Sequence, residues 1–186
     1  MMSDHTTFKV GGPAKYFVVP YRAEDIKKYI LAAEEYKIPY YVIGNGSNLL
    51  VSDKGYDGMI IMLGRDLGNI TVNGDMITAE AGTSLARLFN TARRHSLSGL
   101  EFAAGIPGTL GGACYMNAGA YGGEMKDVLT KVVTIDKQGN THEYKQGEME
   151  LSYRNSIFIR KQEIILSAEM KLCKGDVEKM THKVNE

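Results

Sequence analysis

Three observations on this sequence of 186 residues predict an α+β fold. Strand-like apolar runs outnumber segments with helical spacing, and the two kinds do not alternate regularly along the chain. Turn signals at Asn73-Gly74 and at Gln138-Gly139-Asn140 split two strand-rich segments into hairpins. Hydrophobic residues make up 44% of the chain, which is enough to bury a substantial core.

The first unit is predicted to span residues 1–64 as a small β-α-β arrangement. Residues 7–20 favour a strand, a turn at 11–13 and a second strand, because Phe, Val and Tyr flank a Gly-Gly-Pro sequence. Apolar residues recur at helical spacing between residues 22 and 36, which predicts a helix there. The remaining strands are expected at 40–43 and on both sides of a turn at 53–55, within the stretch 49–63.

The second unit is predicted over residues 65–175. A hairpin at 69–82 precedes a helix that Thr83 caps and Gly99 ends. The later elements are expected to be a hairpin at 128–145, and a loop with two β-rich runs within 151–172. Residues 176–186 read as the opening turns of a helix with Asp176 as its N-cap, and we expect the chain to stop before a further domain.

Composition excludes several classes of function. Twenty-two basic and 22 acidic side chains give zero net charge, so nothing favours a nucleic-acid or membrane-surface partner. The longest apolar runs are too short to cross a bilayer, and residues 1–9 lack the apolar core of a signal peptide. Cys114 and Cys173 do not make a disulfide framework, which favours a cytoplasmic location. The four histidines show no metal-ligand spacing, so no metal site is expected.

A glycine-rich stretch, "LEFAAGIPGTLGGACYMNAGAYGGE", spans residues 100–124 and contains seven glycines. Glycine lets the backbone approach a ligand closely and adopt positive φ angles. The alternative is a set of tight turns or small-residue packing of a helix against a sheet. Seven glycines in one stretch, joined by Pro107, Thr109 and Asn117, favour a ligand site over packing alone.

A second glycine motif, "GNGSN" at residues 44–48, follows a buried strand. Its backbone N–H groups could form a nest for phosphate oxygens. It lacks the third glycine and the helix of a Rossmann fingerprint, and no G-K-[ST] sequence of a P-loop occurs. Two separate glycine loops suit one long ligand, and FAD fits best, with a diphosphate on one loop and a ring system on the other. The chain shows no nucleophile–base pair or metal cluster, which agrees with chemistry supplied by a cofactor.

Four ordered motifs carry a resemblance to a known family. They are "HTTFKVGGPAKYFV", "VIGNGSNLLVSDKG", "LEFAAGIPGTLGGACYMNAGAYGGE" and "LSYRNSIF". The chain resembles, from about residue 5 to residue 173, the UDP-N-acetylenolpyruvoylglucosamine reductases of bacterial peptidoglycan synthesis. The resemblance implies a two-subdomain FAD-binding fold of the p-cresol methylhydroxylase and vanillyl-alcohol oxidase type. It divides the chain into subdomains 1–64 and 65–175.

The resemblance also assigns residues to FAD. The diphosphate loop would be formed by Gly44, Asn45, Gly46, Ser47 and Asn48. The flavin ring and ribityl chain would lie against Gly105, Ile106, Pro107, Gly108, Thr109, Gly111, Gly112, Asn117, Ala118 and Gly119. A late strand residue that touches FAD would be Ile165.

The implied reaction is an NADPH-driven reduction of UDP-N-acetylglucosamine enolpyruvate to UDP-N-acetylmuramate. In the "SYRNS" motif, Arg154 would bind the substrate carboxylate as the catalytic residue, since a permanently charged planar fork matches a carboxylate. Tyr153 would contact substrate or simply pack. From the residues alone, the alternative for Arg154 is a surface ion pair with Glu148 or Glu150.

The chain departs from the family pattern in one region. The "G-S-x-F-K-N-P" motif that carries the family's proton-donating serine does not occur, and neither does the family's second acid. We therefore expect this chain to be the FAD-binding portion, with the substrate-binding domain absent. Two alternatives stay open: another flavin oxidoreductase of the same fold, or a module that binds FAD or a nucleotide without turnover. The sequence predicts no oligomeric state.

Overall fold

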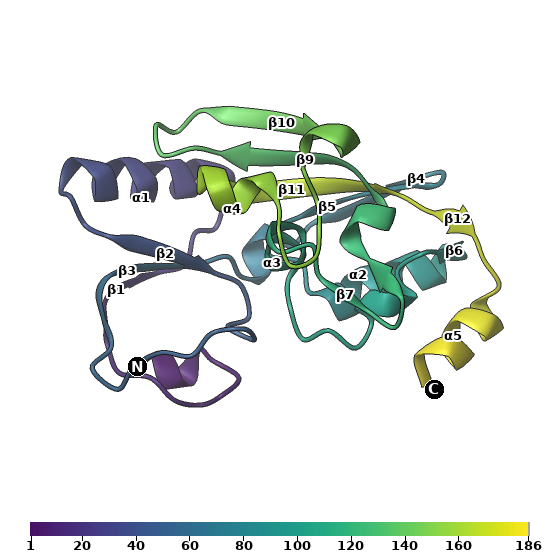
Figure 1. Cartoon of the computed structure of the whole chain (residues 1–186), viewed down its shortest axis with the longest axis horizontal. Helices are drawn as coiled ribbons and strands as arrows, with labels where there is room; N and C mark the ends of the chain where they lie inside the picture. Colours follow the sequence, from purple (N-terminus) through teal and green to yellow (C-terminus); the bar gives the residue numbers. More distant parts are fainter. Residues whose placement is uncertain (186) are drawn as a thin grey trace.

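Two β-sheets organise the fold (Figure 1), and the computed structural model describes residues 1–185, with side-chain surroundings up to residue 182. The first sheet is parallel and has the strand order β1-β3-β2. Its strands are β1 (Ala14–Val18), β2 (Tyr40–Ile43) and β3 (Tyr56–Met62). Helix α1 (Ala23–Glu35) connects β1 to β2 and packs against β3, as the periodicity over 22–36 predicted.

The second sheet is antiparallel and has the order β10-β9-β11-β5-β4. Its strands are β4 (Ile70–Asn73), β5 (Met76–Glu80), β9 (Leu129–Ile135), β10 (Thr141–Lys145) and β11 (Ile164–Lys171). Both predicted hairpins are confirmed, because β4 pairs with β5 and β9 pairs with β10. The late strand β11 pairs with β5 on one side and with β9 on the other, so it joins the two hairpins into one sheet.

Short helices, two-residue strands and single 3-10 turns complete the fold. The helices are α2 (Leu85–Arg94), α3 (Leu110–Tyr115), α4 (Ile157–Lys161) and α5 (Val177–Asn185). The two-residue strands are β6 (Leu97–Ser98), β7 (Gly119–Ala120), β8 (Gly123–Glu124) and β12 (Cys173–Lys174). Single 3-10 turns lie at Met2–Asp4, Arg65–Leu67, Glu101–Ala103, Met125–Asp127 and Gln146–Glu148. Asp176 caps α5 as predicted, since its Oδ1 accepts from the amides of Glu178 and Lys179.

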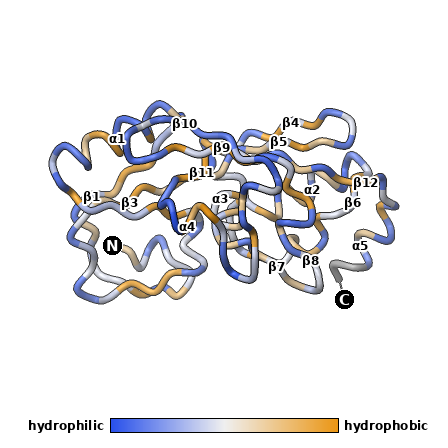
Figure 2. The backbone as a smooth tube through the Cα atoms, turned by 45° about the horizontal axis from the view of Figure 1, so that its top comes forward, coloured by the Kyte–Doolittle hydropathy of each residue, from blue (hydrophilic) through white to orange (hydrophobic). Residues whose placement is uncertain are grey.

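One hydrophobic cluster is shared by the two sheets. Ile26 comes from α1 and Ile61 from β3, whereas Ile77 comes from β5 of the second sheet. Helices α3 and α4 contribute Leu110 and Phe158. All five are essentially inaccessible to solvent. Figure 2 shows hydrophilic and hydrophobic residues mixed along α1, as expected for a helix with one face on the core.

Two predicted strands do not form. Residues 7–10 and 49–51 are loops, because their surroundings satisfy the backbone through contacts between loops rather than through a ladder. Gly12 N donates to Ser52 O at 2.9 Å, and Thr7 N donates to Gly46 O at 3.2 Å. The N-terminal segment therefore lies against the loop that follows β2.

The predicted ends of α2 were also wrong. Ser84, rather than Thr83, is the N-cap, and its Oγ accepts from the amide of Arg87. Thr83 is instead buried, and its Oγ1 has no hydrogen-bond partner among the residues described. The helix ends at Arg94, well before Gly99, because Ser96 takes a left-handed conformation with φ of 54°.

The first β-rich run expected within 151–172 was wrong as well. Residues 157–161 form α4, whose Ile157 and Phe158 are buried in the core. Two neighbouring apolar residues fit a buried helical turn as well as a strand, so the pattern alone did not separate the two. Gln162 ends this helix in a left-handed conformation.

Candidate cofactor site

A cavity of about 920 Å³ runs along the boundary between the two sheets. Both glycine motifs contribute to its wall, although they are about 60 residues apart in the sequence. The side-chain amide of Asn45 donates to Pro107 O at 3.4 Å, which joins the two loops directly. The structure thus brings the two motifs together around one cavity, as a single ligand that contacts both loops requires.

Most of the residues assigned to FAD line this cavity. They are Gly44, Asn45, Gly46, Ser47, Asn48, Ile106, Pro107, Gly108, Thr109, Gly111, Gly112, Ala118 and Ile165. Arg154 lines it too. Gly105, Asn117, Gly119 and Tyr153 are not among the lining residues, and 87% of the Tyr153 side chain is exposed. The roles given to these residues toward a ligand stay predictions.

The loop at 44–48 is shaped by what lies behind it. It follows the carboxyl end of the parallel strand β2, where ligands bind in many open α/β sheets. Gly46 has a φ of 61°, and a Cβ at this position would collide with the carbonyl oxygen of His5. Glycine is therefore required here by the protein itself, and it lets the N-terminal segment support the loop.

The glycines of α3 differ in what surrounds them. A Cβ at Gly111 would lie 2.9 Å from Ala81 Cβ, so this glycine is explained by close packing of α3 on the sheet. A Cβ at Gly112 would meet only Thr109 Oγ1, at 3.7 Å, and would project from the exposed side of α3 into the cavity. Gly108 also lines the cavity without close protein neighbours. Gly108 and Gly112 leave a surface on which a flat ring can lie.

The far end of the cavity was missed by the sequence analysis. Its polar lining residues include Glu34, Tyr40, Lys137 and Gln162, and the Lys137 ammonium donates to Gln162 Oε1 at 2.7 Å. Burial, with Glu34 and Asp136 nearby, raises the pKa of Tyr40, so its hydroxyl stays protonated. No short motif marks these residues, and only the neighbouring strand of Ile165 could have pointed to them.

Arg154 lies on a turn whose two ends bond to each other. Ser152 N donates to Asn155 O and Asn155 N donates to Ser152 O, both at 3.1 Å. Arg154 adopts a φ of 52°, and its guanidinium carbon lies 5.7 Å from the centre of the Tyr153 ring.

The ion-pair alternative for Arg154 is not what the structure shows. Glu150 pairs with Arg160 at 2.8 Å. Glu148 accepts from the amide of Lys145. Within residues 1–182, no carboxylate lies within ion-pair distance of Arg154, so its charge is available to the cavity.

Other kinds of site are not supported in the described part of the chain. No group of three or more His, Cys, Asp and Glu side chains is arranged to hold a metal ion there. No described helix is long and apolar enough to cross a membrane. Cys114 and Cys173 are both free, and burial raises the pKa of the Cys114 thiol well above its usual range.

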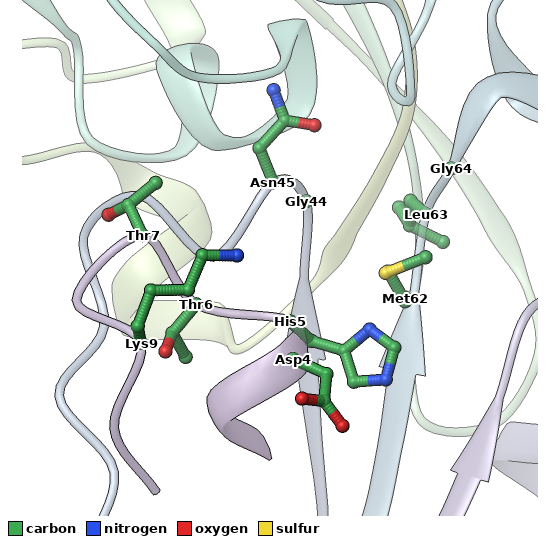
Figure 3. Close-up of a pocket in the computed structure, with 10 residues that line it drawn as sticks. All are labelled: Asp4, His5, Thr6, Thr7, Lys9, Gly44, Asn45, Met62, Leu63 and Gly64. Atoms are coloured by element: carbon green, nitrogen blue, oxygen red, sulfur yellow. The ribbon is translucent and has the colours of Figure 1, made fainter. Parts of the chain in front are cut away.

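A second, smaller cavity of about 470 Å³ shares Gly44 and Asn45 with the first (Figure 3). Its wall combines the N-terminal residues Asp4 to Thr7 with Lys9 and with the carboxyl ends of β2 and β3. Figure 3 shows the Lys9 side chain extending beside the loop at Gly44 and Asn45. A positive charge therefore lies close to the loop expected to hold a diphosphate.

A sequence profile of the FAD binding domain family matches residues 14–145. This chain belongs to that family of FAD-binding domains. It is 50% identical over 177 residues to the UDP-N-acetylenolpyruvoylglucosamine reductase of Syntrophomonas wolfei, a match that covers 95% of this chain and 59% of that protein. The reductase of Caldanaerobacter subterraneus is 47% identical over 185 residues. The chain spans about three-fifths of the length of these curated relatives.

Solved structures agree with this assignment. The UDP-N-acetylenolpyruvylglucosamine reductase of Thermus caldophilus superposes with a TM-score of 0.86 and is 35% identical, over 100% of this chain and 65% of that one. Wild-type Phl p 4.0202, a glucose dehydrogenase, superposes with a TM-score of 0.67 over 93% of this chain and 38% of that one, at 14% identity. The second match shows the fold alone, and together they confirm the p-cresol methylhydroxylase type of FAD-binding fold.

Proposed function

We propose that this chain is the FAD-binding part of an NADPH-dependent UDP-N-acetylenolpyruvoylglucosamine reductase. The observation that carries the proposal is the joining of two glycine motifs along one cavity, with Gly108 and Gly112 open to it. The similarity to reductases of that name supplies the substrate class, a UDP-linked sugar with an enolpyruvyl group. The function would place the protein in the cytoplasm, in peptidoglycan precursor synthesis.

Different cavity residues would bind different parts of FAD. The 44–48 loop would bind the diphosphate through its backbone N–H groups, with Ser47 and Asn48 as further donors. The ring and ribityl chain would lie against Ile106, Pro107, Gly108, Thr109, Gly111, Gly112 and Ala118. Ile165 would contact FAD from β11. The end at Tyr40, Lys137 and Gln162 would take the adenosine. The two-subdomain division at residue 64 belongs to the same proposal.

Arg154 would bind the substrate at the ring end. When bound, FAD supplies hydride transfer from NADPH to the enolpyruvyl double bond. Arg154 would hold the substrate carboxylate in a bidentate manner and stabilise the negative charge that develops on it. No carboxylate among residues 1–182 pairs with Arg154, which supports this role. Tyr153, next to Arg154 and largely exposed, would contact the substrate.

The first test of the proposal is the visible absorption spectrum of the purified chain. We expect the bands of a bound oxidised flavin, with FAD released on denaturation. The matched control is Gly46→Ala, in which the collision with His5 O should distort the diphosphate loop and abolish FAD uptake. A colourless wild-type chain that takes up no added FAD would refute the proposed function.

The reductase activity needs a second experiment. We expect the FAD-loaded chain to oxidise NADPH only when UDP-N-acetylglucosamine enolpyruvate is present. The rate should be roughly 10²- to 10⁴-fold below that of a complete reductase, because the serine motif that donates a proton does not occur in these residues. A chain that binds FAD but never reacts with NADPH would instead be a non-catalytic FAD module.

A further inference from the structure

The side chain of Asn117 makes three hydrogen bonds inside the protein. Its Nδ2 donates to Glu124 Oε2 at 2.6 Å and to Ser152 O at 3.0 Å. Its Oδ1 accepts from the amide of Lys126 at 2.9 Å. Two acceptors face one end of the amide and a donor faces the other, so this orientation is the one that the network allows. Only 2% of Asn117 is exposed, and it does not line the cavity.

The Ser152 carbonyl that Asn117 binds belongs to the turn that carries Arg154. The turn is also held at its other end, because Ser156 Oγ donates to Tyr115 O. Tyr115 is the last residue of α3 and Asn117 lies two residues later, so both hydrogen bonds come from the end of this helix. Tyr115, Met116 and Ala118 in the same stretch line the cavity. The Arg154 turn is thus fixed to the same piece of backbone that forms the wall of the cofactor site.

Glu124 is the charged member of this network. The ammonium of Lys126 and the Asn117 amide lower the pKa of the Glu124 carboxyl, so it is an acceptor at neutral pH. Its own amide donates to Asp127 Oδ2 at 2.9 Å. An ionised carboxylate makes a stronger hydrogen bond than a neutral acceptor does. Glu124 therefore keeps the Asn117 amide turned toward Ser152.

We propose that Asn117 is a positioning residue for Arg154, which it directs into the cavity by holding the turn at Ser152. Asn117 was expected from the sequence to contact FAD, whereas its three hydrogen bonds direct its side chain to the turn that carries Arg154. The role is consistent with an arginine that adopts a left-handed backbone conformation, which persists only where the surroundings fix it. The inference rests on the proposed function, because Arg154 needs an anionic ligand to act on.

The first experiment needs no cofactor. Trypsin cleaves after Arg154 and after Arg160, and both side chains are exposed. Asn117→Asp has the same shape but presents an oxygen to Ser152 O and Glu124, so it should loosen the turn. We expect cleavage at Arg154 to accelerate about tenfold relative to cleavage at Arg160, in Asn117→Asp and in Asn117→Ala. Equal acceleration at both sites would indicate general destabilisation and would overturn the proposal.

The second experiment measures the effect on the bound flavin. Sulfite adds to oxidised flavin and places a negative charge there, which a nearby cation favours. In the FAD-loaded chain, Arg154→Met should raise the sulfite dissociation constant about tenfold, and Asn117→Ala should raise it by a similar factor. The double variant should bind sulfite no more weakly than Arg154→Met alone does, because Asn117 acts through Arg154.

The control is Glu101→Ala, which removes another buried polar side chain that holds Ser98 Oγ and Gly99 N. It should lower the melting temperature while the sulfite dissociation constant stays within about twofold of the wild type. The proposal would be overturned if Asn117→Ala and Arg154→Met had additive effects on the sulfite dissociation constant. It would also be overturned if neither substitution changed that constant. A wild-type chain that takes up no FAD would be a failure of the proposed function, and the trypsin experiment would still decide the role of Asn117.

Discussion

Adjacent glycines in α3 allow packing and ligand binding to be tested separately. Gly111 is buried and faces Ala81, whereas Gly112 is exposed and faces the cavity. The same substitution to alanine should therefore affect a different property at each position. Gly111→Ala should weaken the fold, and Gly112→Ala should leave the fold intact while it weakens FAD binding.

The magnitudes follow from the surroundings of each Cβ. At Gly111 the added carbon would lie 2.9 Å from Ala81 Cβ and 3.3 Å from Ala81 O, so backbone must shift, at a cost of about 1–3 kcal/mol. At Gly112 the nearest atom would be 3.7 Å away, and alanine favours a helix over glycine by up to about 1 kcal/mol. The apo form of Gly112→Ala should thus be as stable as the wild type or slightly more stable.

The assay is urea unfolding of both apo variants, followed by an FAD titration that monitors quenching of flavin fluorescence. We expect Gly112→Ala to raise the FAD dissociation constant at least about tenfold, equivalent to 1.4 kcal/mol. Unchanged FAD affinity in Gly112→Ala would refute the idea that this glycine leaves room for the ring. Unchanged stability in Gly111→Ala would refute the packing argument.

Three further predictions concern charges and thiols. A thiol reagent should modify one cysteine in the native chain, the exposed Cys173, and a second, Cys114, only after unfolding, as titration in urea would show. His142 and nearby amides lower the pKa of Asp136 from 3.8 to about 2, so its contribution to stability is present above pH 3.8 and is lost as the pH falls through 2. Asp136→Asn should therefore lower the melting temperature at pH 7, and the difference from the wild type should shrink below pH 3.8 and vanish below pH 2. Lys9→Met should weaken FAD binding about threefold and make it less sensitive to salt. Identical salt dependence in the two proteins would show that Lys9 does not act on the diphosphate.

The fold was predictable where local signals agreed with tertiary packing. The helix over 22–36 has a clear apolar face, and the hairpins at Asn73-Gly74 and Gln138–Asn140 have turn residues that suit the turns they form. The predictions failed where apolar residues were expected to form a strand but lie in a loop that contacts another loop. Residues 49–51 look like a strand, but the neighbouring Ser52 carbonyl accepts from Gly12 in a contact between loops. That partner is distant in the sequence, and no local pattern reveals it.

The candidate site was predictable as far as its motifs reach. The two glycine loops and the "SYRNS" turn were found from the sequence, because their composition differs from that of ordinary loops. The reasons for individual glycines were not accessible, since Gly111 and Gly112 are adjacent in sequence yet face opposite surroundings. The end of the cavity at Tyr40 and Gln162 was missed because only folding brings those residues together.

The support behind the 44–48 loop affects the entropy of cofactor binding. A loop that becomes ordered only on binding loses conformational freedom at that moment, and the affinity is reduced accordingly. Here Thr7 N bonds to Gly46 O on one side, and Asn45 bonds to Pro107 O on the other. Met2, on the same N-terminal segment, is completely buried and anchors that segment to the first sheet. FAD would therefore meet a loop whose shape is already set, and most of the ordering would take place when the chain folds.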